Sequence, residues 1–115
     1  MTITRFETGP RMSQAVVHGN TVYLAGQVAS TPAPSVAKQT KQILGQIDKL
    51  LKQVGSNKSK LLSANVWLSD IRTFDEMNQA WEAWVSEGNT PARATVEAKL
   101  AGPQYLVEIM VTAAV

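Results

Sequence analysis

The spacing of apolar residues divides the chain into segments of two kinds. Where apolar and polar residues alternate, successive side chains point to opposite faces of a strand. Residues 13–29 contain two such stretches around Gly19-Asn20, a dipeptide typical of a hairpin turn because both residues tolerate positive φ. The predicted strands are residues 2–7, two short strands within 13–29, 60–70, 92–100 and 105–115.

Two other segments have apolar residues at intervals of three and four, which predicts amphipathic helices. The first helix is predicted to start at Ser35, a typical N-cap residue, and to end at Gly55. The second is predicted to begin at residues 73–76, whose sequence TFDE resembles a capping box, and to end at Gly88. A strand separates these two helices.

This order of elements predicts an α+β fold in which both helices cover one face of a single sheet. The residues predicted to face the helices are Leu62, Val66, Ala94, Val96, Val107, Ile109 and Val111. The residues predicted on the other face are Trp67, Arg93, Thr95, Glu97, Leu106, Glu108, Met110 and Thr112. That second face is too polar for a core and too apolar for a surface in full contact with water. We therefore expect it to pack against copies of the same chain.

Composition narrows the possible functions of the protein. The 115 residues, 44% of them hydrophobic, are expected to form one domain over residues 1–115. Without cysteine and with one histidine, His18, the chain cannot form disulfides, use a thiolate or build a His-rich metal site. The net charge is +2 and the basic residues are scattered, so nucleic-acid binding is not expected. No signal-like or membrane-length apolar stretch is present, which leaves a cytoplasmic location as the expectation.

Arg93 and Glu108 are the first candidates for chemistry. Alternation places both on the face away from the helices, and pairing of their strands as a hairpin would bring them near each other. The planar fork of arginine binds carboxylates, and a glutamate can polarise a water. The alternative is a cross-strand salt bridge or two solvated charges.

Asn78 and Gly26 are further candidates. Asn78 lies on or beside the apolar side of the second helix, where its amide either fixes a neighbouring loop or faces a ligand. Gly26 lies within a predicted strand, where it either lets another backbone approach closely or marks a bulge or edge-strand irregularity, and Gln27 follows it with a usable amide. His18 is expected to be exposed beside the hairpin turn, without a catalytic role.

Several longer motifs resemble those of one known family. The segments GNTVYLAGQVA, PARATVE and YLVEIMVTAA, in this order and at these distances, resemble the RidA/YjgF family of enamine/imine deaminases. The segment NVWLSDIRTFDEMNQAWEAW is similar to the central strand and second helix of that family. The resemblance covers nearly the whole chain and implies a fold like that of chorismate mutase. It also implies a homotrimer whose sheets form a central barrel, with three clefts between subunits.

The resemblance also implies an activity and its residues. Arg93 would hold the carboxylate of a small 2-imino acid, and Glu108 would position the water that hydrolyses it to a 2-keto acid and ammonia. Asn78 would lie near the cleft, and backbone amides around Thr95 and Gly26 would bind the substrate. No metal or organic cofactor is implied.

The chain departs from the family pattern at several positions of the predicted cleft. Thr95 stands where cysteine is frequent, Ala25 where serine is common, and Arg11 or Met12 where a tyrosine is expected. Met110 replaces a second acidic residue in the last strand. These changes alter the cleft wall, so two alternatives stay open. One is a non-catalytic binder of small carboxylates, and the other is RNA binding or cleavage, which is ascribed to some relatives.

Overall fold

The alternating segments form strands and the three-to-four-residue repeats form helices, much as their patterns predict. The computed structural model describes residues 1–115. The strands are β1 (Ile3–Thr8), β2 (Ser13–His18), β3 (Thr21–Leu24), β4 (Leu61–Leu68), β5 (Ala92–Glu97) and β6 (Val107–Ala114). The α-helices are α1 (Val36–Gln53) and α2 (Phe74–Trp84), and short 3₁₀ turns cover Lys58–Lys60 and Ile71–Thr73. No helix is both long enough and apolar enough to cross a bilayer.

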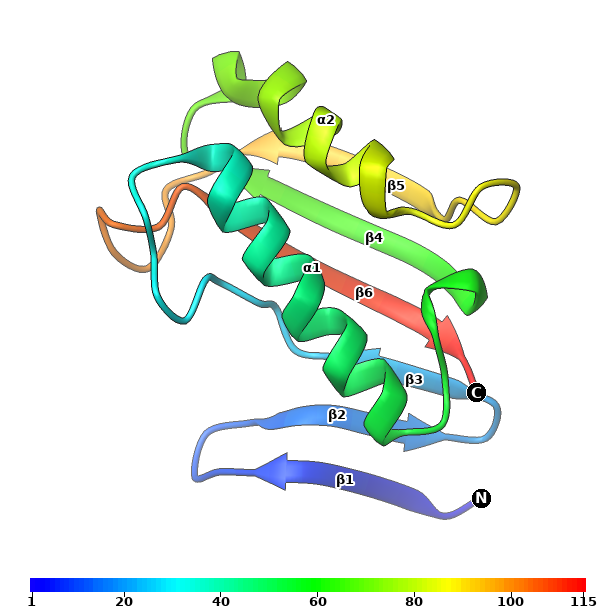
Figure 1. Cartoon of the computed structure of the whole chain (residues 1–115). Coiled ribbons are helices and arrows are strands. Elements are labelled where there is room, and N and C mark those ends of the chain that lie inside the picture. Colours follow the sequence, from blue (N-terminus) through cyan, green and yellow to red (C-terminus); the bar gives the residue numbers. More distant parts are fainter.

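All six strands join one mixed sheet in the order β1-β2-β3-β6-β4-β5. Both helices lie on the same face of it, with α2 over β4 and β5 (Figure 1). The pair β4–β5 is parallel and the other pairs are antiparallel. A parallel pair needs a crossover connection, and α2 supplies it. The predicted α+β fold is therefore confirmed.

The core fills the space between the helices and the sheet. Val66, Val107, Ile109 and Val111 are almost inaccessible to water, which confirms that these predicted residues face the helices. The helix stripe around Ile43 meets them from the other side and is equally buried. At about 25 cal/mol per Å² of apolar area, this burial is the main term that stabilises the fold.

Three residues predicted to face the helices do not. Leu62 is 50% exposed because a bulge between Leu61 and Ser63 shifts the register and gives the core position to Leu61. Val96 is 49% exposed, and Ala94 is exposed as well. Both belong to β5, the edge strand, whose apolar side points away from the helices.

The prediction for β5 was wrong because its side chains alternate in the opposite phase. Arg93 and Thr95 lie opposite Ala64 and Val66 of β4, so they share the helix-covered face with these buried residues. Glu97 lies on the same side and accepts a hydrogen bond from the Ile71 backbone N–H, 3.0 Å away. The predicted hairpin of β5 with β6 does not exist, because β4 lies between them.

The rest of the predicted second face is largely as expected. Trp67 and Glu108 form a register pair on the face that the helices leave open, and Met110 and Thr112 follow at alternate positions of β6. Leu106 lies just before β6 and packs against the core instead. The open face therefore still contains both polar and apolar residues, although Arg93, Thr95 and Glu97 of β5 do not belong to it.

The helix ends agree with the sequence only in part. Ser35 caps α1 as predicted, accepting a hydrogen bond from the Lys38 N–H at 3.2 Å. The predicted capping box of α2 is absent, since the Thr73 hydroxyl donates to the Asp70 carbonyl. Glu76 instead accepts a hydrogen bond from the Ala37 N–H at the start of α1. Helix α2 also ends at Trp84, before Gly88.

Candidate functional site

Arg93 occupies a half-buried position on β5, beneath α2. Its guanidinium carbon lies 5.2 Å from the centre of the Trp81 ring and 5.8 Å from that of Phe74. One guanidinium nitrogen, Nη1, lies 3.9 Å from the sulfur of Met77. These contacts are close enough for the cation to interact with the aromatic faces. The apolar stripe of α2 was evident in the sequence, but its contact with Arg93 was not.

The charge of Arg93 has no carboxylate partner. The one ion pair in the structure joins Asp70 and Arg72 at 2.8 Å, so the salt bridge considered between Arg93 and Glu108 is not formed. Partial burial lowers the pKa of the Arg93 guanidinium, and the negative charge of Glu82 acts in the opposite direction. Arginine still stays protonated at neutral pH. The result is a partly desolvated cation available to an external anion.

Thr95 and Asn78 lie near this cation. Thr95 follows two residues after Arg93 on the same face of β5, and its Oγ1 is buried without a hydrogen-bond partner. Asn78 is half-buried, one helical turn from both Phe74 and Trp81, so it shares the helix side that contacts Arg93. We call Arg93, Thr95 and Asn78 the arginine half-site.

Glu108 lies on the open face of the sheet, next to Gly26. A Cβ atom built on Gly26 would overlap the Oε2 atom of Glu108, so only glycine leaves this carboxylate its place. The residue after Gly26 is fixed to the one after Glu108 by two backbone hydrogen bonds, of 2.8 and 3.0 Å. The close approach at Gly26 is therefore made by the side chain of Glu108, and not by another backbone as the sequence suggested, and Gly26 follows the end of β3 instead of interrupting a strand.

Ala25 and Met12 border the same region at one end of the sheet. The Ala25 N–H donates to the Gln14 carbonyl at 2.9 Å, which ties the segment after β3 to β2. Met12 lies two residues before Gln14 in the β1–β2 turn and is 57% exposed. We call Glu108, Gly26, Ala25 and Met12 the glutamate half-site.

Gln27 connects this half-site to β2 and α1 through its side-chain amide. Its amide nitrogen donates to Gln14 Oε1 at 2.9 Å and to the Ala25 carbonyl at 3.2 Å, and its Oε1 accepts from Gln46 Nε2 at 3.2 Å. Both N–H groups of the amide that the sequence suggested as usable are therefore engaged within the chain, and its oxygen accepts one hydrogen bond there. Gln14 and Gln46 were not identified as partners from the sequence, because they belong to β2 and α1 and no local pattern connects them.

The two half-sites cannot meet within one chain. Arg93 points to the helix-covered face, and Glu108 points to the open face. Because β4 separates their strands, the strand axes are about 10 Å apart. Arg93 is paired with Ala64 of β4, and Glu108 is paired with Trp67 of β4. These partners are three residues apart, so Arg93 and Glu108 are also displaced by about 10 Å along the strand direction. The predicted proximity of Arg93 and Glu108 on one face is thus wrong for a single chain.

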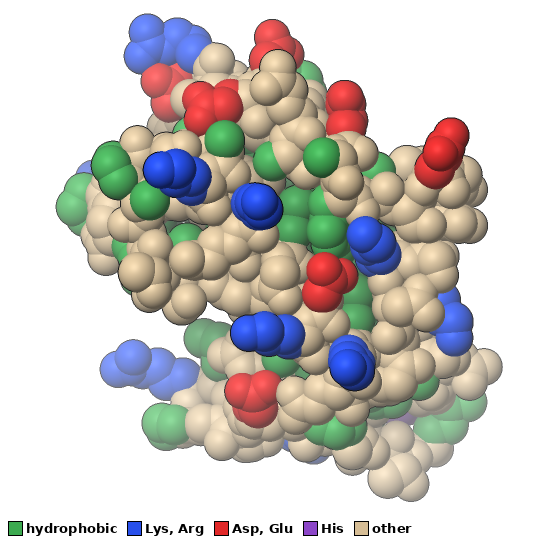
Figure 2. All heavy atoms as spheres, in the orientation of Figure 1, with side chains coloured by type: hydrophobic (Ala, Val, Ile, Leu, Met, Phe, Trp, Pro, Cys, Tyr) green, Lys and Arg blue, Asp and Glu red, His purple; other side chains and the backbone are tan.

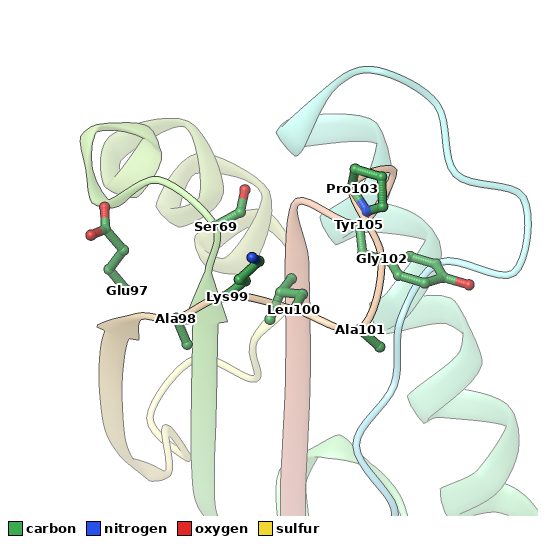
Figure 3. A pocket seen from close by; sticks show the side chains of 9 residues that line it. All are labelled: Ser69, Glu97, Ala98, Lys99, Leu100, Ala101, Gly102, Pro103 and Tyr105. Carbon is green, nitrogen blue, oxygen red and sulfur yellow. The ribbon is translucent and has the colours of Figure 1, made fainter.

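A separate hollow of about 560 Å³ lies where the β5–β6 connection crosses the end of β4 (Figure 3). Glu97 and Lys99 are the charged residues on its wall. None of the predicted site residues contributes to it. The lining residues are Ser69, Glu97, Ala98, Lys99, Leu100, Ala101, Gly102, Pro103 and Tyr105.

Comparison with known proteins places this chain among well-defined relatives. Residues 2–115 match the family model described as Endoribonuclease L-PSP. The chain is 47% identical over 114 residues to a RutC family protein of Haemophilus influenzae, covering 98% of each chain. It is 45% identical to the RutC family protein YoaB of Escherichia coli over the full length of both.

A solved structure supports the same relationship. A member of the YjgF protein family from Neisseria meningitidis superimposes with a TM-score of 0.97 and 45% identity, covering 99% of this chain and 95% of that one. The agreement of sequence and structure extends over the motifs that contain both half-sites. The chain therefore belongs to the RidA/YjgF family, as those motifs predicted.

Proposed function

We propose that this protein hydrolyses small 2-imino acids to 2-keto acids and ammonia in clefts between the subunits of a homotrimer. The observation that carries the proposal is Arg93, a half-buried cation with no carboxylate partner in its own chain. A substrate carboxylate would supply that partner through paired hydrogen bonds. Family membership supports the same chemistry.

The subunit boundary follows from the geometry of the half-sites. Arg93 and Glu108 lie on opposite faces of the sheet. A small substrate cannot reach across the sheet, so it can contact both residues only if they come from different copies of the chain. The open face also exposes apolar groups, including Tyr23 at 46% and Val96 at 49%. A closed ring of three sheets would cover these groups and bring unlike half-sites together.

In this cleft, Arg93 would hold the carboxylate of the substrate while Glu108 of the neighbouring copy holds a water. The water oxygen attacks the imine carbon as Glu108 accepts a proton from it. That proton passes to the nitrogen, which gives a carbinolamine. Glu108 then accepts the proton of the new hydroxyl and passes it to the nitrogen, so the C–N bond breaks as the C=O bond forms, and ammonia and the 2-keto acid are released. Positioning and charge complementarity suffice for this reaction because the imine is already electrophilic.

The departures from the family pattern are compatible with this mechanism. Ala25 takes part through its backbone, which Gln14 fixes, so a serine hydroxyl is not needed to hold the loop. Thr95 retains the backbone groups of its position and adds a buried hydroxyl. Met12 and Met110 make the cleft more apolar, which favours substrates with small apolar side chains.

The test is direct imine hydrolysis. An amino-acid oxidase generates 2-iminopropanoate in place, and semicarbazide traps whatever imine remains. Wild type should lower the amount of trapped imine, and Arg93→Ala and Glu108→Gln should not. Circular dichroism would show that both variants remain folded. Equal trapping with wild type and with buffer would refute the deaminase.

A non-catalytic carboxylate binder is the second candidate. It is favoured by the arginine half-site alone, because that half-site can bind an anion without any contribution from Glu108. Binding of pyruvate that depends on Arg93, without imine hydrolysis, would identify it. RNA binding has less support, since acidic side chains interrupt the basic ones on the helix face (Figure 2).

A further inference from the structure

Aromatic rings take the place that a carboxylate usually holds beside a half-buried arginine. The guanidinium of Arg93 lies over Trp81 at 5.2 Å and Phe74 at 5.8 Å, and no carboxylate lies within ion-pair distance. We call Phe74 and Trp81 the aromatic shelf. Trp81 is the buried member, with 5% of its surface exposed, whereas Phe74 is 37% exposed.

The shelf affects both the position and the availability of the cation. Ring faces attract the guanidinium through their quadrupole but do not compete for its N–H groups in the plane, as a carboxylate would. Glu82, the next residue after Trp81, influences Arg93 through its charge without pairing with it. Without the ring, the long side chain is free to move toward Glu82 or into water.

From these contacts we propose that Trp81 is a positioning residue, which holds the Arg93 guanidinium as an unpaired cation aligned for a planar carboxylate. This inference rests on the proposed function, since it assigns Arg93 the task of carboxylate binding. Trp81 does not touch the substrate in this scheme. Trp81 instead orders the side chain of Arg93 before the substrate binds.

The expected effect follows from that ordering. Immobilising one flexible side chain on binding costs about 0.5–1.5 kcal/mol, which corresponds to about a 2- to 12-fold change in Kd. Trp81→Leu should therefore weaken pyruvate binding by about this factor and raise KM for 2-iminopropanoate similarly, with kcat much less affected. Trp81→Phe retains a ring face and should restore most of the affinity.

Trp84→Leu is the matched control. It removes a second indole from the same helix, 5.6 Å from Trp81 between ring centres, and Trp84 does not contact the guanidinium. This variant should lose stability but keep the pyruvate Kd within about twofold of wild type. NMR relaxation of the Arg93 Nε–H group gives a second readout, because Trp81→Leu should make that group more mobile while Trp84→Leu should not.

Calorimetric titration with pyruvate distinguishes the possible failures, with uncharged pyruvamide as the ligand control. Equal pyruvate affinity in wild type and Trp81→Leu, with binding lost in Arg93→Gln, would overturn the role of Trp81 and leave the proposed function standing. Binding that depends on both residues without imine hydrolysis would support Trp81 and refute the deaminase. No binding of pyruvate to wild type, together with no imine hydrolysis, would overturn both. The result we expect is weaker binding in Trp81→Leu, rescue in Trp81→Phe and no change in Trp84→Leu.

Discussion

Complementation between two inactive variants tests the split site most directly. Arg93→Ala removes the carboxylate anchor, and Glu108→Gln removes the group that accepts a proton from the water. Each variant alone should be inactive, because every site in its assembly lacks one essential group. If each cleft takes Arg93 from one chain and Glu108 from its neighbour, mixed assemblies will contain some complete sites.

The recovered activity can be calculated from the geometry. In a closed ring of subunits, each cleft is complete only when the chain that supplies Arg93 carries the Glu108 change and its neighbour carries the Arg93 change. With equal amounts and random assembly, each condition holds in half of the cases, so about 25% of the sites are complete. Homotrimers of one variant contain no complete site, and every mixed trimer contains one complete site among three. Mixed trimers purified away from the homotrimers should therefore hydrolyse the imine at about a third of the wild-type rate per chain.

The assay requires proof that the chains have mixed. The two variants are co-expressed with different tags, purified through both tags in sequence and weighed by native mass spectrometry. A mixture of separately assembled variants, never unfolded together, is the control and should stay inactive. Verified mixed assemblies with no hydrolysis, when wild type is active, would refute the placement of Arg93 and Glu108 in one shared cleft.

Three further substitutions test individual contacts. Gly26→Ala should lower imine hydrolysis by about 100-fold, because the new methyl group displaces the flexible carboxylate of Glu108; thermal unfolding should change little, and an active variant would contradict the close approach. Thr95→Val removes a buried hydroxyl without a partner, so urea titration should show an unfolding free energy unchanged or raised by about 1 kcal/mol, and a clear loss would contradict this. Gln27→Leu leaves two glutamine side chains without their partner and should lower the unfolding free energy by about 2 kcal/mol, whereas an unchanged midpoint would mean that water replaces the network.

The elements that the sequence predicted well are those whose own residues determine them. Helix α1 has a complete apolar stripe, a serine that caps its start and Gly55 with a φ of +80° after its end. The hairpin of β2 and β3 has Gly19-Asn20 between two alternating strands. Helix α2 was predicted less well, because Glu76 resembles a capping residue but bonds to the backbone of α1. Such a partner lies far away in the sequence and leaves no local pattern.

The site was predicted residue by residue but not in its arrangement. The motif resemblance identifies Arg93 and Glu108, while the alternation of apolar and polar residues predicts that both lie on one face. Alternation shows which residues share a face, but it does not show which face is covered. For β5 the sequence predicts that the apolar residues Ala94 and Val96 are buried, but in the structure they are exposed.

That reversal has a physical reason, which also bears on function. Strand β5 is an edge strand with one neighbouring strand, and α2 covers one of its faces. The aromatic side chains of α2 can pack against a cation as well as against an aliphatic side chain. Arg93 can therefore take the covered side without an ion pair, and Val96 is left on the open face, where burial against another copy would stabilise the assembly. Because Arg93 takes the helix-covered face of β5, it cannot contact Glu108 of its own chain. If the proposed cleft is correct, a subunit that folds alone has both half-sites and no active site, so catalysis requires assembly.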